Sequence, residues 1–133
     1  MRHFSQTAEY ALRIMAQLTI TEASVPLSSH DLSKSTGISI HFLSKVLRRL
    51  VNRGFLTSKK GCGGGYALAR PPKEIRFIDI LKIGNSPPEP DHCIFGWKKC
   101  RAENPCPLHP LWADMKKSFQ KWTENTTLAN LKR

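Results

Sequence analysis

Residues 37–54 read GISIHFLSKVLRRLVNRG and have the pattern of an amphipathic helix. Four apolar side chains recur in it at three- and four-residue spacing, which places them on one side of a helix: Leu43, Val46, Leu47 and Leu50. The opposite side carries polar and basic residues, namely Ser39, His41, Ser44, Lys45, Arg48 and Arg49. Because Ser39 can cap the start and Gly54 can follow the end, the pattern predicts an amphipathic helix with a basic outer face.

The segments on either side of this helix predict its partners. Residues 4–20 carry an apolar stripe typical of a longer helix, made by Phe4, Ala8, Ala11, Leu12, Met15 and Leu18. A short helix around Leu32, capped by Ser28 or Ser29, follows, and the turn at Gly37 leads into the amphipathic helix. Residues 55–58 and 65–69 then have the composition of two strands joined by a glycine-rich tip. Together these elements predict a winged helix-turn-helix.

The remainder of the chain divides into two parts. A short helix is expected over residues 77–83, and residues 84–110 have an irregular composition with three cysteines. A final helix is expected over residues 111–124, with an apolar stripe close to coiled-coil spacing at Leu111, Met115, Phe119 and Trp122. We therefore expect a mainly α fold with a small β-hairpin wing. Its expected parts are a DNA-binding domain (1–83), a cysteine-rich loop (84–110) and a C-terminal helix and tail (111–133).

Charge is concentrated around the amphipathic helix and the hairpin. The chain has 21 Lys and Arg against 10 Asp and Glu, a formal net charge of +11. Residues 41–76 hold nine basic residues and one acidic residue, which accounts for +8 of that charge. A helix that enters the major groove needs donors on its outer face, and Lys59, Lys60, Gly63 and Gly64 of the hairpin can approach phosphates. This concentration favours a DNA-binding face over an ordinary solvated helix face.

No membrane or export segment is expected. The N-terminus lacks the apolar core of a signal peptide, and no stretch approaches the roughly 18 apolar residues of a spanning helix. We therefore expect a cytoplasmic protein, in which disulfides are rare. The four cysteines are accordingly expected to be metal ligands or reactive thiols.

Three of these cysteines are close in sequence. Six residues separate Cys93 from Cys100, five separate Cys100 from Cys106, and His109 lies three residues further on. Three thiolates with an imidazole can hold an iron–sulfur cluster. The spacing is wider than that of common zinc sites but does not exclude zinc, and thiols without metal are a third interpretation. Spacing alone leaves these alternatives open.

The fourth cysteine, Cys62, stands at the tip of the hairpin between glycines and close to Lys59 and Lys60. A reactive thiol is one interpretation of this setting. A tolerated small residue is the simpler interpretation and carries more weight.

Several pieces of the sequence resemble the Rrf-type winged-helix regulators, the family that includes IscR, NsrR, RirA and CymR. They are residues 9–13 (EYALR), 37–43 (GISIHFL), 61–68 (GCGGGYAL) and Cys93, Cys100 and Cys106 followed by PLHPLW. The resemblance covers essentially the whole chain. One departure is the wing, which carries Lys60-Gly61-Cys62 where many relatives carry Arg-Gly and a residue other than cysteine.

The resemblance implies a homodimer joined by the C-terminal helices through Leu111, Met115, Phe119 and Trp122, and a palindromic double-stranded DNA operator. It also implies one iron–sulfur cluster per subunit, 2Fe–2S or 4Fe–4S, held by Cys93, Cys100 and Cys106. The fourth ligand is His109 in the pattern of IscR-like members and Glu9 of the partner subunit in the pattern of NsrR-like members.

We therefore expect a repressor that senses iron, nitric oxide or redox state through the cluster. A metal-free repressor of the same family, controlled by thiols or by a partner, is the first alternative. A zinc-structured adaptor that binds RNA or protein is the second. An enzyme is not expected, because no acid pair, nucleophile–base set or phosphate-binding loop stands out.

Overall fold

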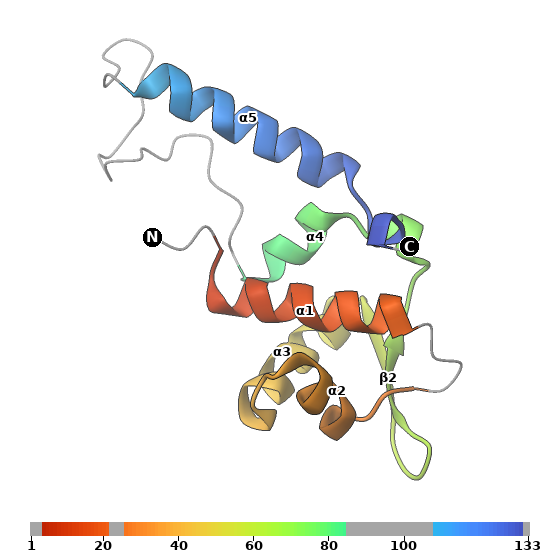
Figure 1. Cartoon of the computed structure of the whole chain (residues 1–133). Coiled ribbons are helices and arrows are strands. Elements are labelled where there is room, and N and C mark those ends of the chain that lie inside the picture. The colour runs from red at the N-terminus through yellow and green to blue at the C-terminus, as the bar shows by residue number, and fades with distance from the viewer. Residues whose placement is uncertain (1–3, 22–25, 85–107, 132–133) are drawn as a thin grey trace.

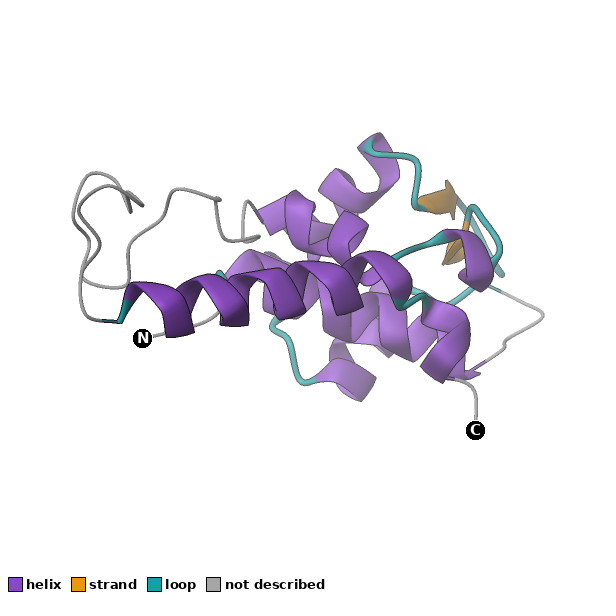
Figure 2. Ribbon diagram, turned by 90° about the horizontal axis from the view of Figure 1, so that it is seen from above, coloured by secondary structure: helices purple, strands orange, loops and turns teal. Residues whose placement is uncertain are grey.

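The computed structural model describes residues 4–21, 26–84 and 108–131 (Figure 1). The helices are α1 (Gln6–Thr21), α2 (Ser29–Thr36), α3 (Ile40–Asn52), α4 (Phe77–Leu81) and α5 (His109–Asn125). Two strands, β1 (Leu56–Lys59) and β2 (Gly65–Leu68), and three short 3-10 helices, η1 (Pro72–Glu74), η2 (Lys82–Gly84) and η3 (Leu128–Leu131), complete the described chain. Figure 2 shows the two strands at one edge of a molecule otherwise built from helices. The expected fold class is confirmed.

Helix α1 is the centre of the core. It packs on α2, α3, α4, η2, η3 and β2. The buried side of α1 includes Ala11, Met15 and Leu18, as its apolar stripe predicts, and also Ile14. Phe4 precedes the helix and is only partly buried. The apolar face of α1 therefore packs against both the helix-turn-helix and the C-terminal elements.

The helix-turn-helix is fixed by local hydrogen bonds. Ser28 caps α2, since its Oγ accepts a hydrogen bond from the Asp31 amide at 3.0 Å. Gly37 ends α2 with a φ of 76°, and the Ser33 hydroxyl donates to the Ile38 carbonyl at 2.6 Å across the turn. The four inward residues predicted for α3 are all buried. The orientation of α3 about its own axis is thus as predicted.

The wing is a two-stranded antiparallel sheet with a third, single-residue partner. Leu56 pairs with Leu68 and Lys59 pairs with Gly65. Leu27 adds two backbone hydrogen bonds to Tyr66, of 3.0 and 2.7 Å. The first strand begins one residue later than predicted, because the Phe55 amide still donates to the Leu50 carbonyl at the end of α3.

Helix α5 begins two residues before the predicted start, and the chain then folds back onto the core. Leu128 is buried in the main hydrophobic cluster, and its amide donates to the Ile75 carbonyl at 3.0 Å. The Phe77 amide donates to the Thr126 carbonyl at 2.8 Å. The sequence did not predict this return, which ties the end of α5 to the hydrophobic core and to the start of α4.

Four aromatic rings join α5 to the rest of the fold. Phe4 lies next to Phe77 and Phe119, with ring centroids 6.5 and 5.8 Å apart. The ring centroid of Trp122 lies 5.0 Å from that of Phe77 and 5.3 Å from that of Phe119, so the four rings contact one another in a cycle. These contacts hold the C-terminal half of α5, while its N-terminal half projects away from the other helices (Figure 1).

The start of α4 is held by an ion pair at this junction. Arg76 Nη2 lies 3.1 Å from Asp79 Oδ1, and Asp79 Oδ2 accepts a hydrogen bond from the Arg76 amide at 3.2 Å. The hydrogen bond and charge of Asp79 raise the pKa of Arg76 above its ordinary value.

Within the described residues, no helix has both the length and the apolar character needed to cross a bilayer.

Candidate nucleic-acid interface

The outer face of α3 is fully presented to solvent. Its buried side packs on α1 and α2, so the polar side faces outward along the whole helix. All six residues predicted for DNA contact are exposed: Ser39, His41, Ser44, Lys45, Arg48 and Arg49. Exposure on one helix face is the geometry that groove reading requires.

The two serines of this face differ in their hydrogen bonds. Ser44 donates its hydroxyl to the Ile40 carbonyl at 2.8 Å, so toward solvent it presents oxygen lone pairs. Ser39 occupies the N-cap position of α3, yet its side chain makes no capping hydrogen bond. The Ser39 hydroxyl is therefore available to another partner at the end of the helix.

Arg49 differs from the other basic residues of the face. Its Nη1 donates to the carbonyl of Ile83 in η2, at 3.3 Å. The helical period places Arg49 at the flank of the polar side, next to the elements that cover the core. Its guanidinium is thus directed toward η2.

An aromatic side chain not singled out from the sequence also lies on the outside of α3. Phe42 is exposed, and its ring centroid lies 6.2 Å from that of Tyr10 in α1 and 6.0 Å from that of His41. Arg13 covers the Tyr10 ring at 5.7 Å. The sequence does carry a sign of this, because Phe42 falls outside the buried three- and four-residue stripe.

The tip of the wing is open. Gly61 and Gly63 have φ values of 93° and 75°, and a Cβ built on either would have no neighbour within 4 Å. Lys59 and Lys60 are exposed, and Cys62 is an exposed free thiol. Such a tip lets the main chain approach another backbone closely. Gly64 is different, because a Cβ there would lie 2.9 Å from the Gly61 carbonyl oxygen.

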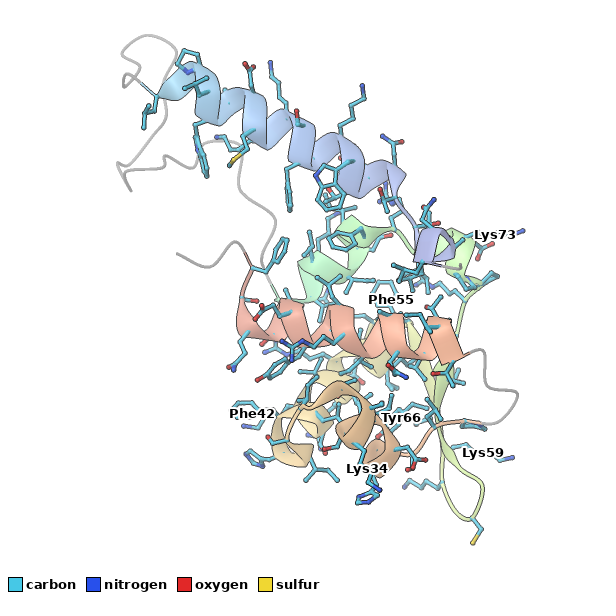
Figure 3. The ribbon with its side chains drawn as sticks, viewed as in Figure 1. Lys34, Phe42, Phe55, Lys59, Tyr66 and Lys73 are labelled. Atoms are coloured by element: carbon cyan, nitrogen blue, oxygen red, sulfur yellow. The ribbon has the colours of Figure 1, made fainter. Side chains whose placement is uncertain are left out.

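The basic residues of the central stretch do not all share one face. Figure 3 places Lys59 on the side of the molecule where α2 and the wing lie, and Lys73 far from it, near the C-terminal turn. Arg70 lies with its guanidinium 5.0 Å from the centre of the Phe55 ring. The charge on the side of α3 and the wing is consequently smaller than the +8 of residues 41–76 suggests.

The three cysteines predicted as cluster ligands, Cys93, Cys100 and Cys106, lie outside the described residues. His109 is the first residue of α5, and Glu9 lies in the first turn of α1. Across the described ranges no three His, Cys, Asp or Glu side chains gather as a metal site. The structure thus places the two candidate fourth ligands on helices and leaves the cysteine site as a prediction.

The predicted dimerisation face is partly used within the chain. Leu111, Met115 and Trp122 are 70%, 45% and 44% exposed, whereas Phe119 packs against Phe4 and Trp122. An apolar strip therefore extends along α5 from its exposed start to the aromatic contacts with α4.

Comparisons with known proteins agree with this architecture. The family model for Rrf2, described as an iron-dependent transcriptional regulator, matches residues 4–133. A helix-turn-helix transcriptional regulator inferred in Aquifex aeolicus is 32% identical over 130 residues, covering 96% of this chain and 90% of that protein. The regulator IscR of Yersinia pestis is 29% identical over 122 residues, covering 92% of this chain and 74% of IscR.

The solved structure of CymR, the global cysteine regulator of Bacillus subtilis, has the same fold. Its TM-score is 0.80 at 24% identity, with 98% of this chain and 96% of CymR covered. Since the family model spans almost the entire sequence, the assignment extends to the chain as a whole and not only to its helix-turn-helix. The chain belongs to the Rrf2 family of winged-helix transcriptional regulators, which bind DNA and are not enzymes.

Proposed function

We propose that this regulator is a cytoplasmic homodimeric repressor that binds a palindromic double-stranded DNA operator. The proposal rests mainly on one observation: the polar face of α3 and the tip of the wing are both exposed. One such unit reads one half-site, and a two-fold dimer reads two half-sites separated by about one or two helical turns. Two-fold symmetry in the protein then requires a near-palindrome in the DNA.

Within each half-site, α3 lies in the major groove. His41, Lys45 and Arg48 offer donors to base edges and phosphates, and Ser39 and Ser44 add hydroxyl oxygens. The wing reaches the flanking backbone or minor groove with Lys59, Lys60, Gly63 and Gly64. Phosphate contacts set the register and base contacts set the sequence preference.

Replacing Arg48 tests this placement. Arg48→Ala should weaken binding to a duplex selected from a random pool by the wild-type chain. A lost phosphate contact reduces the salt slope by about one, whereas a lost bidentate guanine contact costs about 1–3 kcal/mol and relaxes specificity. Lys73→Ala is the matched control, since Lys73 lies near the C-terminal turn. Equal effects of the two replacements on affinity would refute the placement of α3.

The sensor is an iron–sulfur cluster, 2Fe–2S or 4Fe–4S, with one per subunit. The donor set supports it: three thiolates from Cys93, Cys100 and Cys106, with His109 or Glu9 of the partner subunit as fourth ligand. The iron dependence in the family description and the similarity to IscR point the same way. When bound, the group supplies an iron-, nitric oxide- or redox-sensitive centre.

The chain's own contribution is to connect those thiolates to the dimer. Helix α5 begins at His109, three residues after Cys106, so gathering the thiolates fixes the start of the dimerisation helix. Releasing them frees that start, and the spacing of the two α3 helices then changes. Because both half-sites must be met at once, a small change in spacing is enough to alter affinity.

Absorption spectra with iron and sulfide analysis of anaerobically purified protein test the sensor. The wild-type chain should absorb broadly between roughly 320 and 460 nm, as thiolate-held iron does. Cys100→Ala should remove this absorbance and leave a folded protein, whereas the control Cys62→Ala should keep it. Full iron and sulfide content in Cys100→Ala would exclude the assigned ligands.

A metal-free thiol or partner switch is the second candidate. Its support is the fold shared with CymR and the exposed thiol of Cys62 at the wing tip. Protein that stays colourless after anaerobic reconstitution, with operator binding that changes on thiol oxidation in the wild type and not in Cys62→Ala, would establish it. Stoichiometric zinc with sequence-blind binding would instead indicate the zinc-structured adaptor.

A further inference from the structure

We propose that Arg49 is a positioning residue that couples residues 83–84 to the DNA-reading helix, and that it does not contact DNA. The inference rests on the proposed function, in which the segment after residue 84 holds the sensor. It assigns the connection between that segment and α3 to one side chain.

The first observation is the contact itself. Arg49 Nη1 donates to the Ile83 carbonyl at 3.3 Å, and Ile83 is only 3% exposed. Ile83 belongs to η2 and to the main hydrophobic cluster, so its carbonyl is held by a packed side chain. The guanidinium of Arg49 thus binds a carbonyl whose position is fixed by the packing of Ile83 in the core.

The second observation concerns the neighbouring glycine. The Ser5 hydroxyl donates to the Gly84 carbonyl at 2.8 Å, which fixes η2 on the start of α1. A Cβ built on Gly84 would lie 2.5 Å from the Ala8 amide nitrogen and 2.8 Å from the Ala8 Cβ. Gly84 is therefore pressed against the α1 backbone, where no larger residue fits without movement.

The third observation is the place of these residues in the chain. Gly84 is the last described residue before residues 85–107, which contain Cys93, Cys100 and Cys106. Because Gly84 and Ile83 directly precede this segment in the chain, they are the first described residues that a displacement of the segment would move. These two residues are held on one side by α1 and on the other by α3 through Arg49.

Arg49 is distinct from its neighbours in this respect. Within the parts of the chain that the structure describes, Lys45 and Arg48 make no hydrogen bond to another element. The planar guanidinium of Arg49 is always charged and offers donors in a rigid fork, so it can follow the carbonyl that it binds. A shift of η2 away from α1 is thereby passed to the C-terminal half of α3.

A small forced displacement of η2 tests the coupling without any cofactor. Gly84→Ala moves η2 away from Ala8, and Arg49→Met removes the guanidinium link while keeping an unbranched apolar stem. Arg48→Met is the matched control, one residue away on the same helix. Each is made alone, and Gly84→Ala is combined with either arginine variant. Affinity and salt slope are measured on a duplex selected from a random pool by the wild-type chain.

We expect Gly84→Ala to change the Kd about 2- to 10-fold, the effect of one hydrogen bond. The change should persist in the Arg48→Met background and disappear in the Arg49→Met background. Arg49→Met alone should keep the wild-type salt slope and sequence preference, whereas Arg48→Met should either lower the salt slope by about one or relax the sequence preference. An equal effect of Gly84→Ala in both backgrounds, or no effect in the wild type, would overturn the proposal.

Hydrogen exchange of the α3 amides without DNA separates this proposal from the proposed function. Gly84→Ala should speed exchange in α3 when Arg49 is present and leave it unchanged in Arg49→Met. If the wild type selects no duplex, the DNA-binding proposal fails, yet exchange still decides the coupling. Should Gly84→Ala not fold, Ser5→Ala replaces it, since it removes the hydrogen bond to Gly84 without adding atoms. It also removes the hydrogen bond that Ser5 Oγ accepts from the Ala8 amide, so its effect is compared between the Arg48→Met and Arg49→Met backgrounds, which share that loss.

Discussion

The glycines of the wing serve different physical purposes, although the sequence presents them as one run. Gly63 has a φ of 75° and open space around the site of a Cβ. Gly65 has a φ of 144°, and a Cβ there would collide with the Leu27 carbonyl and lie 2.9 Å from the Ser28 amide nitrogen. Gly65 therefore permits the approach of Leu27 to the sheet, whereas Gly63 only shapes the tip.

Gly65→Ala should consequently destabilise the protein more than Gly63→Ala. At Gly63 the penalty is the left-handed conformation alone, about 1–2 kcal/mol. At Gly65 the collision with Leu27 adds to backbone strain of about 1–3 kcal/mol, and it disturbs the pairing of Leu27 with Tyr66. Urea denaturation of both variants measures the difference. Equal free energies of unfolding for the two variants would contradict this account of Gly65.

Two residue-level features show where sequence reasoning stops. The helical period placed Arg49 correctly on the exposed side of α3, but it could not say that the guanidinium reaches Ile83, 34 positions later in the chain. Phe42 was likewise outside the predicted stripe, while its contact with Tyr10 depends on how α1 crosses α3. Period fixes the side of a helix, and tertiary packing selects the neighbour.

At the scale of elements, α2 and α3 begin with serines that act differently. Ser28 accepts a hydrogen bond from the Asp31 amide, whereas Ser39 makes no side-chain capping bond. A serine at an N-cap is therefore a stability determinant in α2 and a free polar group in α3. Of the two N-cap serines, only Ser28 therefore stabilises its helix through its side chain.

Ser28→Ala should lower the free energy of unfolding by about 1 kcal/mol, the usual loss for a capping side chain. Ser39→Ala should change stability by less than about 0.5 kcal/mol, as surface replacements do, and should weaken binding to the selected duplex. Chemical denaturation and fluorescence anisotropy measure the two effects. A stability loss in Ser39→Ala as large as that in Ser28→Ala would show that Ser39 does cap α3.

The elements themselves were predicted with unequal success. The amphipathic helix now seen as α3 was predicted with its buried residues. The regular spacing of its apolar residues, with Ser39 before it and Gly54 after it, defines this helix from local sequence alone. The C-terminal turn η3 was not, because Leu128 enters the core through contacts with Ile75, more than fifty positions earlier. A segment stabilised only by distant residues carries little sign of its structure in its own sequence. The cysteine site stays a prediction.

At the scale of the whole molecule, α5 divides into a held half and a projecting half. The C-terminal half is fastened by Phe4, Phe77, Phe119 and Trp122, while Leu111 is exposed at the other end (Figure 1). An exposed apolar strip on a projecting helix is costly for a lone chain in water. In the homodimer that we propose, a second copy covers the strip, which removes that cost and brings the two α3 helices together.

Leu111→Glu should therefore convert the proposed dimer into monomers of about 15.0 kDa, because the carboxylate would be buried in the proposed α5 interface. Operator affinity should fall steeply, since one half-site no longer assists binding to the other. Ile20→Glu is the matched control, because Ile20 is a similarly exposed apolar residue, 61% exposed, near the end of α1 and outside the predicted dimerisation residues. Sedimentation velocity and anisotropy measure both variants. A Leu111→Glu protein that remains dimeric and binds its duplex with wild-type affinity would place the dimer interface elsewhere.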